Sequence, residues 1–201
     1  MAPITLQDIT LSYYTQGLTA LRGILFKASQ SDPSSETGDP ADLLSVRLYP
    51  DMYPLSFQVF VCTNMAKETL ERLLGRDLSS HPWNPDEETY QTMDGLFARI
   101  DETLQIVESV KPEEIEGTED KTGLPLTLGV HGTTEMTGRG YVLGYSLPNF
   151  FFHLATAYDI LRMKGVPLGK RDFLDPIINE HYPEGFSMKK KNAQGGSGGN
   201  F

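Results

Sequence analysis

The sequence contains one group of polar side chains that could bind a ligand and move a proton. Its members interrupt two segments that are far apart in the chain: Asp51 and Gln58 in the first, Asn149 and His153 in the second. If the two segments form helices that pack face to face, one carboxylate, one imidazole and two amides converge. That set is enough to orient a small molecule or to shuttle a proton. We therefore predict His153 and Asp51 as catalytic residues, and Gln58 and Asn149 as ligand-binding residues.

Each of these residues also has a purely structural interpretation. Asp51 precedes the start of a predicted helix and could be its N-cap. Gln58 could hydrogen-bond a neighbouring helix. His153 could be a core histidine paired with Asn149, because an unpaired buried polar group costs about 1–3 kcal/mol. Both interpretations of each residue stay open at this point.

Other reactive side chains are weaker candidates for a functional role. Tyr145 and Tyr158 could donate from their phenols to a ligand, so we add both to the predicted ligand-binding residues, although packing explains most tyrosines in helical bundles. Cys62 is expected to behave as a small hydrophobe, since nothing near it in the sequence would lower its pKa. The glycine patterns of phosphate-binding loops and the G-x-S-x-G nucleophile motif are absent.

The composition narrows the class of protein. The 201 residues include 17 Lys and Arg against 27 Asp and Glu, which gives a formal net charge of −10. This acidity argues against nucleic acids and anionic membranes as partners, because both require a cationic surface. The single cysteine excludes an internal disulfide and fits a reducing compartment. No apolar run reaches the ~18–20 residues of a membrane span and no signal peptide is evident, so we expect a cytoplasmic protein.

Four segments with helical periodicity must position these residues. The clearest has its apolar residues at steps of four and three, which places them on one face of a helix: Met93, Phe97, Ile100, Leu104 and Val107. The expected helix starts are Thr5 or Asp8, Asp51, Asn84-Pro85, and Gly138. Gly75 is expected to end the second helix, and Pro148 to kink the fourth or split it in two. In the first helix, Gly17 and Gly23 lower the helix propensity without breaking the pattern.

Between the third and fourth helices, the alternating leucines of residues 124–128 and the glycines that follow predict a small β-hairpin up to Met136. Four amphipathic helices must bury their apolar faces together. The sequence therefore predicts an all-α fold, a four-helix bundle with a long crossover and a small β-hairpin before the last helix. We expect a single domain over residues 1–174 and a C-terminal extension over 175–201, disordered from about residue 189.

Three stretches together resemble the family called domain of unknown function 1993. They are residues 50–59 (PDMYPLSFQV), 117–120 (GTED) and 147–174 (LPNFFFHLATAYDILRMKGVPLGKRDFL), of which the last is the specific one. The resemblance covers about residues 5–174. The family is similar to DinB/YfiT-like proteins, which are four-helix bundles, so the resemblance implies the fold that the helix count already favours.

DinB-like proteins often hold a divalent metal with three histidines, one on the second helix and two a turn apart on the fourth. This sequence departs from that pattern. The fourth helix has His153, but Asn149 and Ala157 stand one turn to either side, and the second helix has no histidine. We therefore expect neither a metal site nor a cofactor.

Three functions follow from these observations. The first, which we favour, is a small-molecule pocket with metal-independent acid–base chemistry on a metabolite, such as isomerisation, cyclisation or group transfer. The second is a metal-dependent enzyme of the DinB type, which the missing histidines disfavour. The third is a non-catalytic binding or interaction module that forms a homodimer, as DinB-like proteins often do. Whether the chain is an enzyme stays open.

Overall fold

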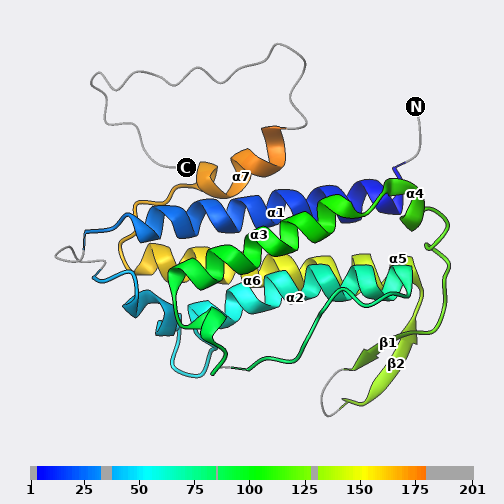
Figure 1. Cartoon of the computed structure of the whole chain (residues 1–201), viewed down its shortest axis with the longest axis horizontal. Helices are drawn as coiled ribbons and strands as arrows, with labels where there is room; N and C mark the ends of the chain where they lie inside the picture. Colours follow the sequence, from blue (N-terminus) through cyan, green and yellow to red (C-terminus); the bar gives the residue numbers. More distant parts are fainter. Residues whose placement is uncertain (1–3, 33–37, 85, 128–130, 180–201) are drawn as a thin grey trace.

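The structure, a computed structural model, describes residues 4–32, 38–84, 86–127 and 131–179. Its described residues contain four long helices packed side by side, which confirms the predicted four-helix bundle (Figure 1). The four helices are α1 (Leu6–Ser29), α2 (Leu55–Leu74), α3 (Met93–Ser109) and α6 (Leu147–Met163). Their apolar stripes, including the predicted stripe of α3, pack into one core.

Around the bundle, the helices follow the order α1, α3, α2, α6, so that α1 and α2 are diagonal and contact each other little. Helices α2 and α3 run in the same direction (Figure 1). The chain therefore has to return along the whole bundle between them, through residues 75–92, which we call the crossover segment. It follows α2 backwards: Ser80 bonds Glu71, His81 bonds Asn64, and Trp83 packs on Phe57.

The connection from α3 to α6 joins diagonal helices, as its length predicts. It contains the short helix α4 (Pro112–Ile115), the strands β1 (Leu124–Thr127) and β2 (Thr133–Met136), and the helical turn α5 (Gly138–Tyr141). The two strands pair antiparallel, with Leu124 opposite Met136 and Thr127 opposite Thr133. Leu124 and Leu126 are buried, so the leucine side of the predicted hairpin packs on the bundle.

Two predicted helix starts are wrong. Helix α2 starts at Leu55 after Pro54 and has no side-chain cap, while Asp51 is exposed in a turn closed by the bond from Met52 N to Tyr49 O. The physical reason is Pro54, which disfavours helical backbone at the residue before it.

Helix α1 starts as predicted, with Thr5 as its N-cap and Asp8 completing a capping box. Gly75 ends α2 in the left-handed conformation, also as predicted.

Helix α3 starts at Met93, not at Asn84-Pro85. Of the acidic residues just after Asn84, only Glu88 lies in a helical turn, the 3-10 turn Glu88–Tyr90, and the extended backbone of Thr92 separates this turn from α3. Pro85 itself lies outside the described residues. The observed N-cap is Thr92, whose hydroxyl oxygen accepts a hydrogen bond from Gly95 N at 3.0 Å.

Thr92 caps a helix and Asp51 does not, so their replacement should affect stability differently. Thr92→Ala is expected to lower the free energy of unfolding by about 1 kcal/mol, since it removes an N-cap hydrogen bond. Asp51→Ala, which removes no cap, is expected to change it by less than about 0.5 kcal/mol. Urea unfolding of both variants measures the difference. A loss of about 1 kcal/mol in Asp51→Ala would restore Asp51 as a cap, and no loss in Thr92→Ala would refute Thr92 as the N-cap of α3.

The predicted fourth helix is divided, though not by a simple proline kink. A π-helical turn, Val142–Ser146, lies between α5 and α6, and Pro148 falls in the first turn of α6, where its missing N–H is tolerated. The π turn directs Ser146 into the core, in hydrogen-bond contact with Tyr14 and Thr69. Tyr14 Oη also lies 2.9 Å from Thr69 Oγ1, and burial raises the pKa of Tyr14 to about 12.

A further helix, α7 (Lys170–Ile178), packs along α1 (Figure 1). Lys27 Nζ lies 2.7 Å from Asp172, and Phe173 meets the ring of Tyr158 edge to face. This helix continues past residue 174, the predicted domain boundary. The predicted disordered tail from residue 189 lies outside the described residues. Within the described ranges, no helix is both long and apolar enough to span a membrane.

Candidate functional site

A polar groove of about 340 Å³ lies between α2 and α6 and holds three of the predicted site residues. Its lining consists of Phe57, Phe60, Val61, Asn64, Met65 and Glu68 from α2, and of Tyr145, Asn149 and His153 from the π turn and α6. Helices α2 and α6 pack closely against each other, as the convergence of these residues requires. The two helices that were predicted to face each other therefore do so.

The fourth predicted residue, Gln58, holds the imidazole. Gln58 is buried, and its Oε1 lies 2.6 Å from His153 Nδ1. Its Nε2 donates to the backbone oxygens of Tyr53 at 2.8 Å and Pro54 at 3.4 Å, and these acceptors fix which end of the amide faces the histidine. Because Oε1 can only accept, His153 Nδ1 carries the proton. The other ring nitrogen, Nε2, then keeps its lone pair.

The surroundings of His153 keep the ring neutral. Burial lowers the pKa of His153 from 6.5 to about 4. The ring meets Phe57 and Phe152 edge on, with centroids 5.9 and 5.2 Å away. At neutral pH, His153 is thus an uncharged imidazole of fixed tautomer whose Nε2 acts as a hydrogen-bond acceptor.

The remaining polar groups give the groove one negative charge and no lining cation. Glu68 lines it and pairs with Arg72 at 2.5 Å. Asn64 Oδ1 accepts from the backbone N–H of His81, which fixes its amide. Burial, and then Glu68, raise the pKa of Tyr145, so its phenol is a donor at neutral pH. An imidazole acceptor and a phenol donor therefore border the same space.

Two predicted residues lie elsewhere. Asp51 is exposed in the turn before α2 and does not line the groove. Tyr158 packs against Phe173 of α7 and does not line it either. Asn64 and Glu68 line the groove and were missed by the sequence reasoning. Helical spacing places Asn64 and Glu68 on one face of α2 with Phe57 and Val61, but this spacing does not tell whether that face borders a groove or solvent.

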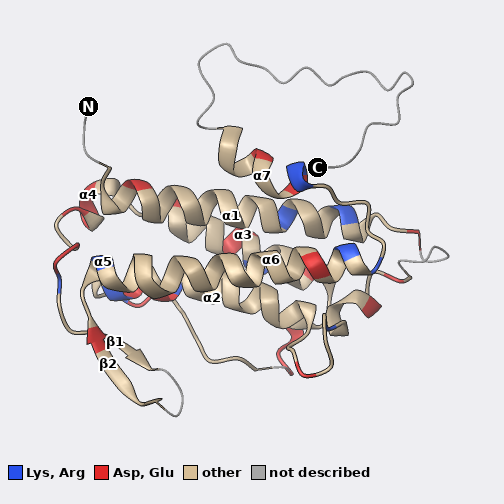
Figure 2. Ribbon diagram, turned by 180° about the vertical axis from the view of Figure 1, so that it is seen from behind, with Lys and Arg blue, Asp and Glu red and all other residues tan. Residues whose placement is uncertain are grey.

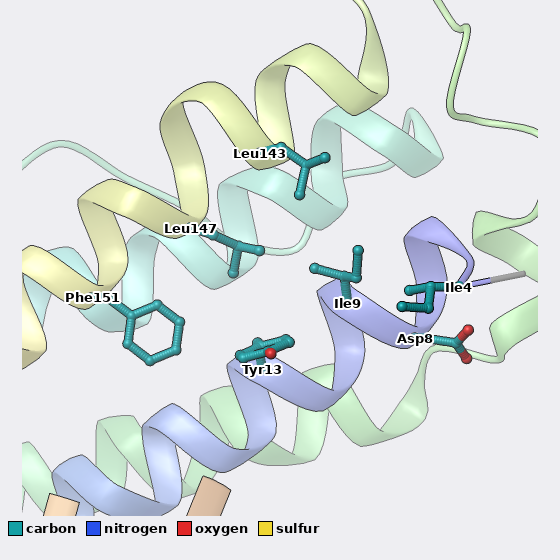
Figure 3. A pocket seen from close by; sticks show the side chains of 7 residues that line it. All are labelled: Ile4, Asp8, Ile9, Tyr13, Leu143, Leu147 and Phe151. Carbon is teal, nitrogen blue, oxygen red and sulfur yellow. The ribbon is translucent and has the colours of Figure 1, made fainter. Parts of the chain in front are cut away.

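A second hollow, of about 610 Å³, is apolar and lies between the start of α1 and the start of α6 (Figure 3). Its lining is Ile4, Asp8, Ile9, Tyr13, Leu143, Leu147 and Phe151. Figure 2 shows few charged residues along the middle of the α1–α6 face. The one carboxylate, Asp8, already accepts from Thr5 N in the helix cap. This hollow has room for an apolar group and offers little for acid–base chemistry.

The donor set of the polar groove does not fit a metal. Within the described residues there is no group of three or more His, Cys, Asp or Glu side chains that could hold an ion. His153 Nδ1 is engaged by Gln58, so the ring offers one nitrogen beside amide oxygens, unlike the three-histidine set that the family resemblance describes. Cys62 is buried, and burial raises the pKa of its thiol, so it supplies no thiolate.

Comparisons with known proteins agree with the fold. The family model described as domain of unknown function (DUF1993) matches residues 6–174. Among solved structures, the chain is similar to a crystal structure of a DinB family member protein from Shewanella denitrificans. The TM-score is 0.69 and the identity 28%, over 84% of this chain and 91% of that chain. No match was found among curated proteins.

Proposed function

The chain belongs to the DUF1993 family, and from that premise we propose that it binds a small molecule in the polar groove between α2 and α6. The observation that supports this proposal is the fixed tautomer of His153, whose ring lines a space of about 340 Å³ and keeps Nε2 as an acceptor. A histidine with a purely structural role would not need to line such a space. Gln58 acts as the positioning residue, because its amide is itself held by two backbone carbonyls.

The charges of the groove select the ligand class. No lysine or arginine lines it, whereas Glu68, paired with Arg72 at 2.5 Å, does. An anionic ligand would be desolvated without a counterion, which costs free energy. We therefore propose a neutral or cationic metabolite with an N–H or O–H group, donated to His153 Nε2, and with an acceptor for the phenol of Tyr145. The amide of Asn149 adds a further donor and acceptor.

The chemistry that this arrangement would support is metal-independent acid–base catalysis: isomerisation, cyclisation or group transfer on a metabolite. His153 Nε2 would take a proton from the bound molecule, and Tyr145 would donate a hydrogen bond to an oxygen that gains charge. A protonated His153 is disfavoured by burial, so the ring would hold the proton only until it returns it to the bound molecule. Asp51 has no role in this proposal, because it lies outside the groove.

Binding is testable with a reporter that the protein already contains. The single tryptophan, Trp83, packs 5.2 Å from Phe57 and 5.1 Å from Phe60, two walls of the groove. In a screen of neutral and cationic fragments of metabolite size, binders are expected to change Trp83 fluorescence and the ¹⁵N shift of His153 Nε2. His153→Asn keeps a donor near Nδ1 but deletes the Nε2 acceptor, so it should weaken binding about tenfold.

The matched control is His131→Asn, a histidine exposed at the end of the hairpin. Its affinity for the same fragments should equal that of the unmodified protein. Equal affinity in His153→Asn, or a screen in which no fragment moves the His153 resonance, would refute the proposed site. Conversion of a bound fragment would decide for an enzyme over a binding module.

The apolar hollow on α1 and α6 favours a second candidate, a non-catalytic module that pairs with another copy. Ile4 is 80% exposed and Leu143 is 46% exposed at its rim, and exposed apolar patches often mark interaction sites. The homodimer is a proposal on this ground. The acidic charge and the single cysteine likewise support our proposal of a cytoplasmic protein that binds neither nucleic acid nor membrane.

A further inference from the structure

Two cationic side chains are buried on the other side of α2, where it meets α3. Lys67 is 1% exposed and Arg99 is 6% exposed. Removing a charge from water costs several kcal/mol unless an opposite charge and hydrogen bonds compensate for it. Two neighbouring buried cations therefore require a strong compensating partner, and the described residues can be searched for one.

The hydrogen bonds of the two cations are incomplete. Arg99 Nε donates to Thr63 Oγ1 at 3.1 Å, but Arg99 Nη2 is buried without a partner. Tyr90, whose ring lies 5.6 Å from the Arg99 guanidinium carbon, is 2% exposed, and its hydroxyl also lacks a partner. Lys67 makes no hydrogen bond or ion pair with the residues that the structure describes. Arg99 Nη2 and the Tyr90 hydroxyl are thus buried without a partner within the described part of the chain, and the unpaired Lys67 lies near enough to Arg99 for that charge to lower its pKa.

Three carboxylates lie near enough to act on Lys67 through space, but none pairs with it. Glu71 accepts the N–H groups of Leu78 and Ser80, and Glu87 lies 3.9 Å from His81 Nε2. Glu102 is exposed on α3. No described carboxylate oxygen lies within 4.0 Å of a Lys67 or Arg99 nitrogen. Burial, and then Arg99, lower the pKa of Lys67, so these carboxylates do not compensate for its desolvation.

We propose that Lys67, Arg99 and Tyr90 form a buried binding site for a compact monovalent anion, of the size of a halide. The class of ligand follows from the side chains, because hydrogen-bond donors that lack an acceptor favour a ligand that only accepts hydrogen bonds. The size follows from the burial, since an occupant surrounded by these side chains has almost no contact with solvent. Chloride meets both requirements, whereas a large organic anion would have to emerge from the interior.

The site would tie the crossover segment to the bundle. Tyr90 contacts Trp83 at 4.7 Å, and Trp83 packs on Phe57 and Phe60, which line the polar groove. An anion between Tyr90, α2 and α3 would hold this aromatic wall in place. The proposed anion site does not depend on the proposed ligand, so each can fail without the other.

Chloride is the probe. Thermal unfolding is followed in sodium chloride and in sodium gluconate at equal ionic strength. A bound chloride should raise the folding equilibrium constant at least tenfold, or the Tm by about 3–6 °C, in a saturable manner. ³⁵Cl NMR of the folded protein should show line broadening that bromide competes away. Lys67→Met should remove the chloride effect on both measurements.

Lys170→Met is the matched control, because it removes the same formal charge from an exposed lysine and should keep the full chloride effect. Should Lys67→Met fail to fold, Tyr90→Phe carries the test, since it retains both cations and removes one donor. It is expected to reduce the chloride effect. Equal Tm values in the two salts without ³⁵Cl broadening, or an undiminished effect in Lys67→Met or Tyr90→Phe, would overturn the proposal.

Discussion

The free energy of unfolding is expected to fall by about 2 kcal/mol between pH 7 and pH 5 through His153 alone. Burial lowers the pKa of this histidine from 6.5 to about 4 in the folded protein. Between these two values, the unfolded chain binds a proton that the folded chain does not, so stability falls as the pH falls. Each pH unit in this window is worth about 1.4 kcal/mol, and about 1.5 units separate 6.5 from pH 5.

Urea unfolding at pH 7, 6 and 5 measures this dependence. His153→Asn cannot titrate but can still donate to Gln58, so its stability should change with pH by about 2 kcal/mol less than that of the unmodified protein. His131→Asn, on the exposed hairpin, should keep the full dependence. If His153→Asn and the unmodified protein lose stability in parallel, His153 is not held neutral by its surroundings, and the argument for a fixed acceptor fails with it.

The imidazole–amide pair could be predicted from the sequence, because buried polar groups need partners. Gln58 and His153 each interrupt an apolar stripe, and a polar residue in such a position is either paired or lines a cavity. Both outcomes are present in the structure, because Gln58 pairs with His153 and His153 lines the groove. Asn149, one turn from His153, shares its face for the same reason of helical spacing.

Other residues of the molecule could not be predicted in this way. Asn64 and Glu68 look like a solvated face of α2 until the position of α6 is known. Lys67 and Arg99 look exposed for the same reason, since charged residues are rarely buried. Their burial depends on which helices are neighbours, and periodicity within one helix says nothing about the order of helices around a bundle.

The helix starts show the limit of local signals. A capping residue stabilises a helix end by only about 1 kcal/mol, which is less than the effect of a nearby proline or of one buried aromatic ring. Pro54 therefore moved the start of α2 past Asp51, and α3 begins only after the extended Thr92, beyond the separate turn that holds the buried Tyr90. The apolar stripe of α3 was predicted correctly, because many residues specify it together.

Replacing Gly17 with alanine should have the other large effect on stability. Alanine has the higher helix propensity, yet this substitution is expected to destabilise the protein. A Cβ atom at this position would lie 2.3 Å from Phe150 Cε1 and 2.8 Å from Cζ, where α1 and α6 meet. Phe150 is fully buried, and its ring is enclosed by Tyr14 at 5.2 Å and Phe151 at 5.3 Å, so it has little freedom to move. Gly17→Ala is expected to destabilise the protein by about 2 kcal/mol and to lower Tm by about 4–8 °C.

Gly23, six residues further along the same helix, provides the matched control. A Cβ atom there meets no heavy atom within 4 Å, so Gly23→Ala should gain stability by about 0.5–1 kcal/mol from helix propensity alone. The sequence treats the two glycines alike, and only the packing of α6 separates them. Phe150→Leu in the Gly17→Ala background should recover part of the loss, because it removes the ring atoms that the new methyl group meets. A Gly17→Ala variant with an unchanged or higher Tm would contradict the close approach of α1 and α6 at Gly17, and with it the position of the helix that carries His153.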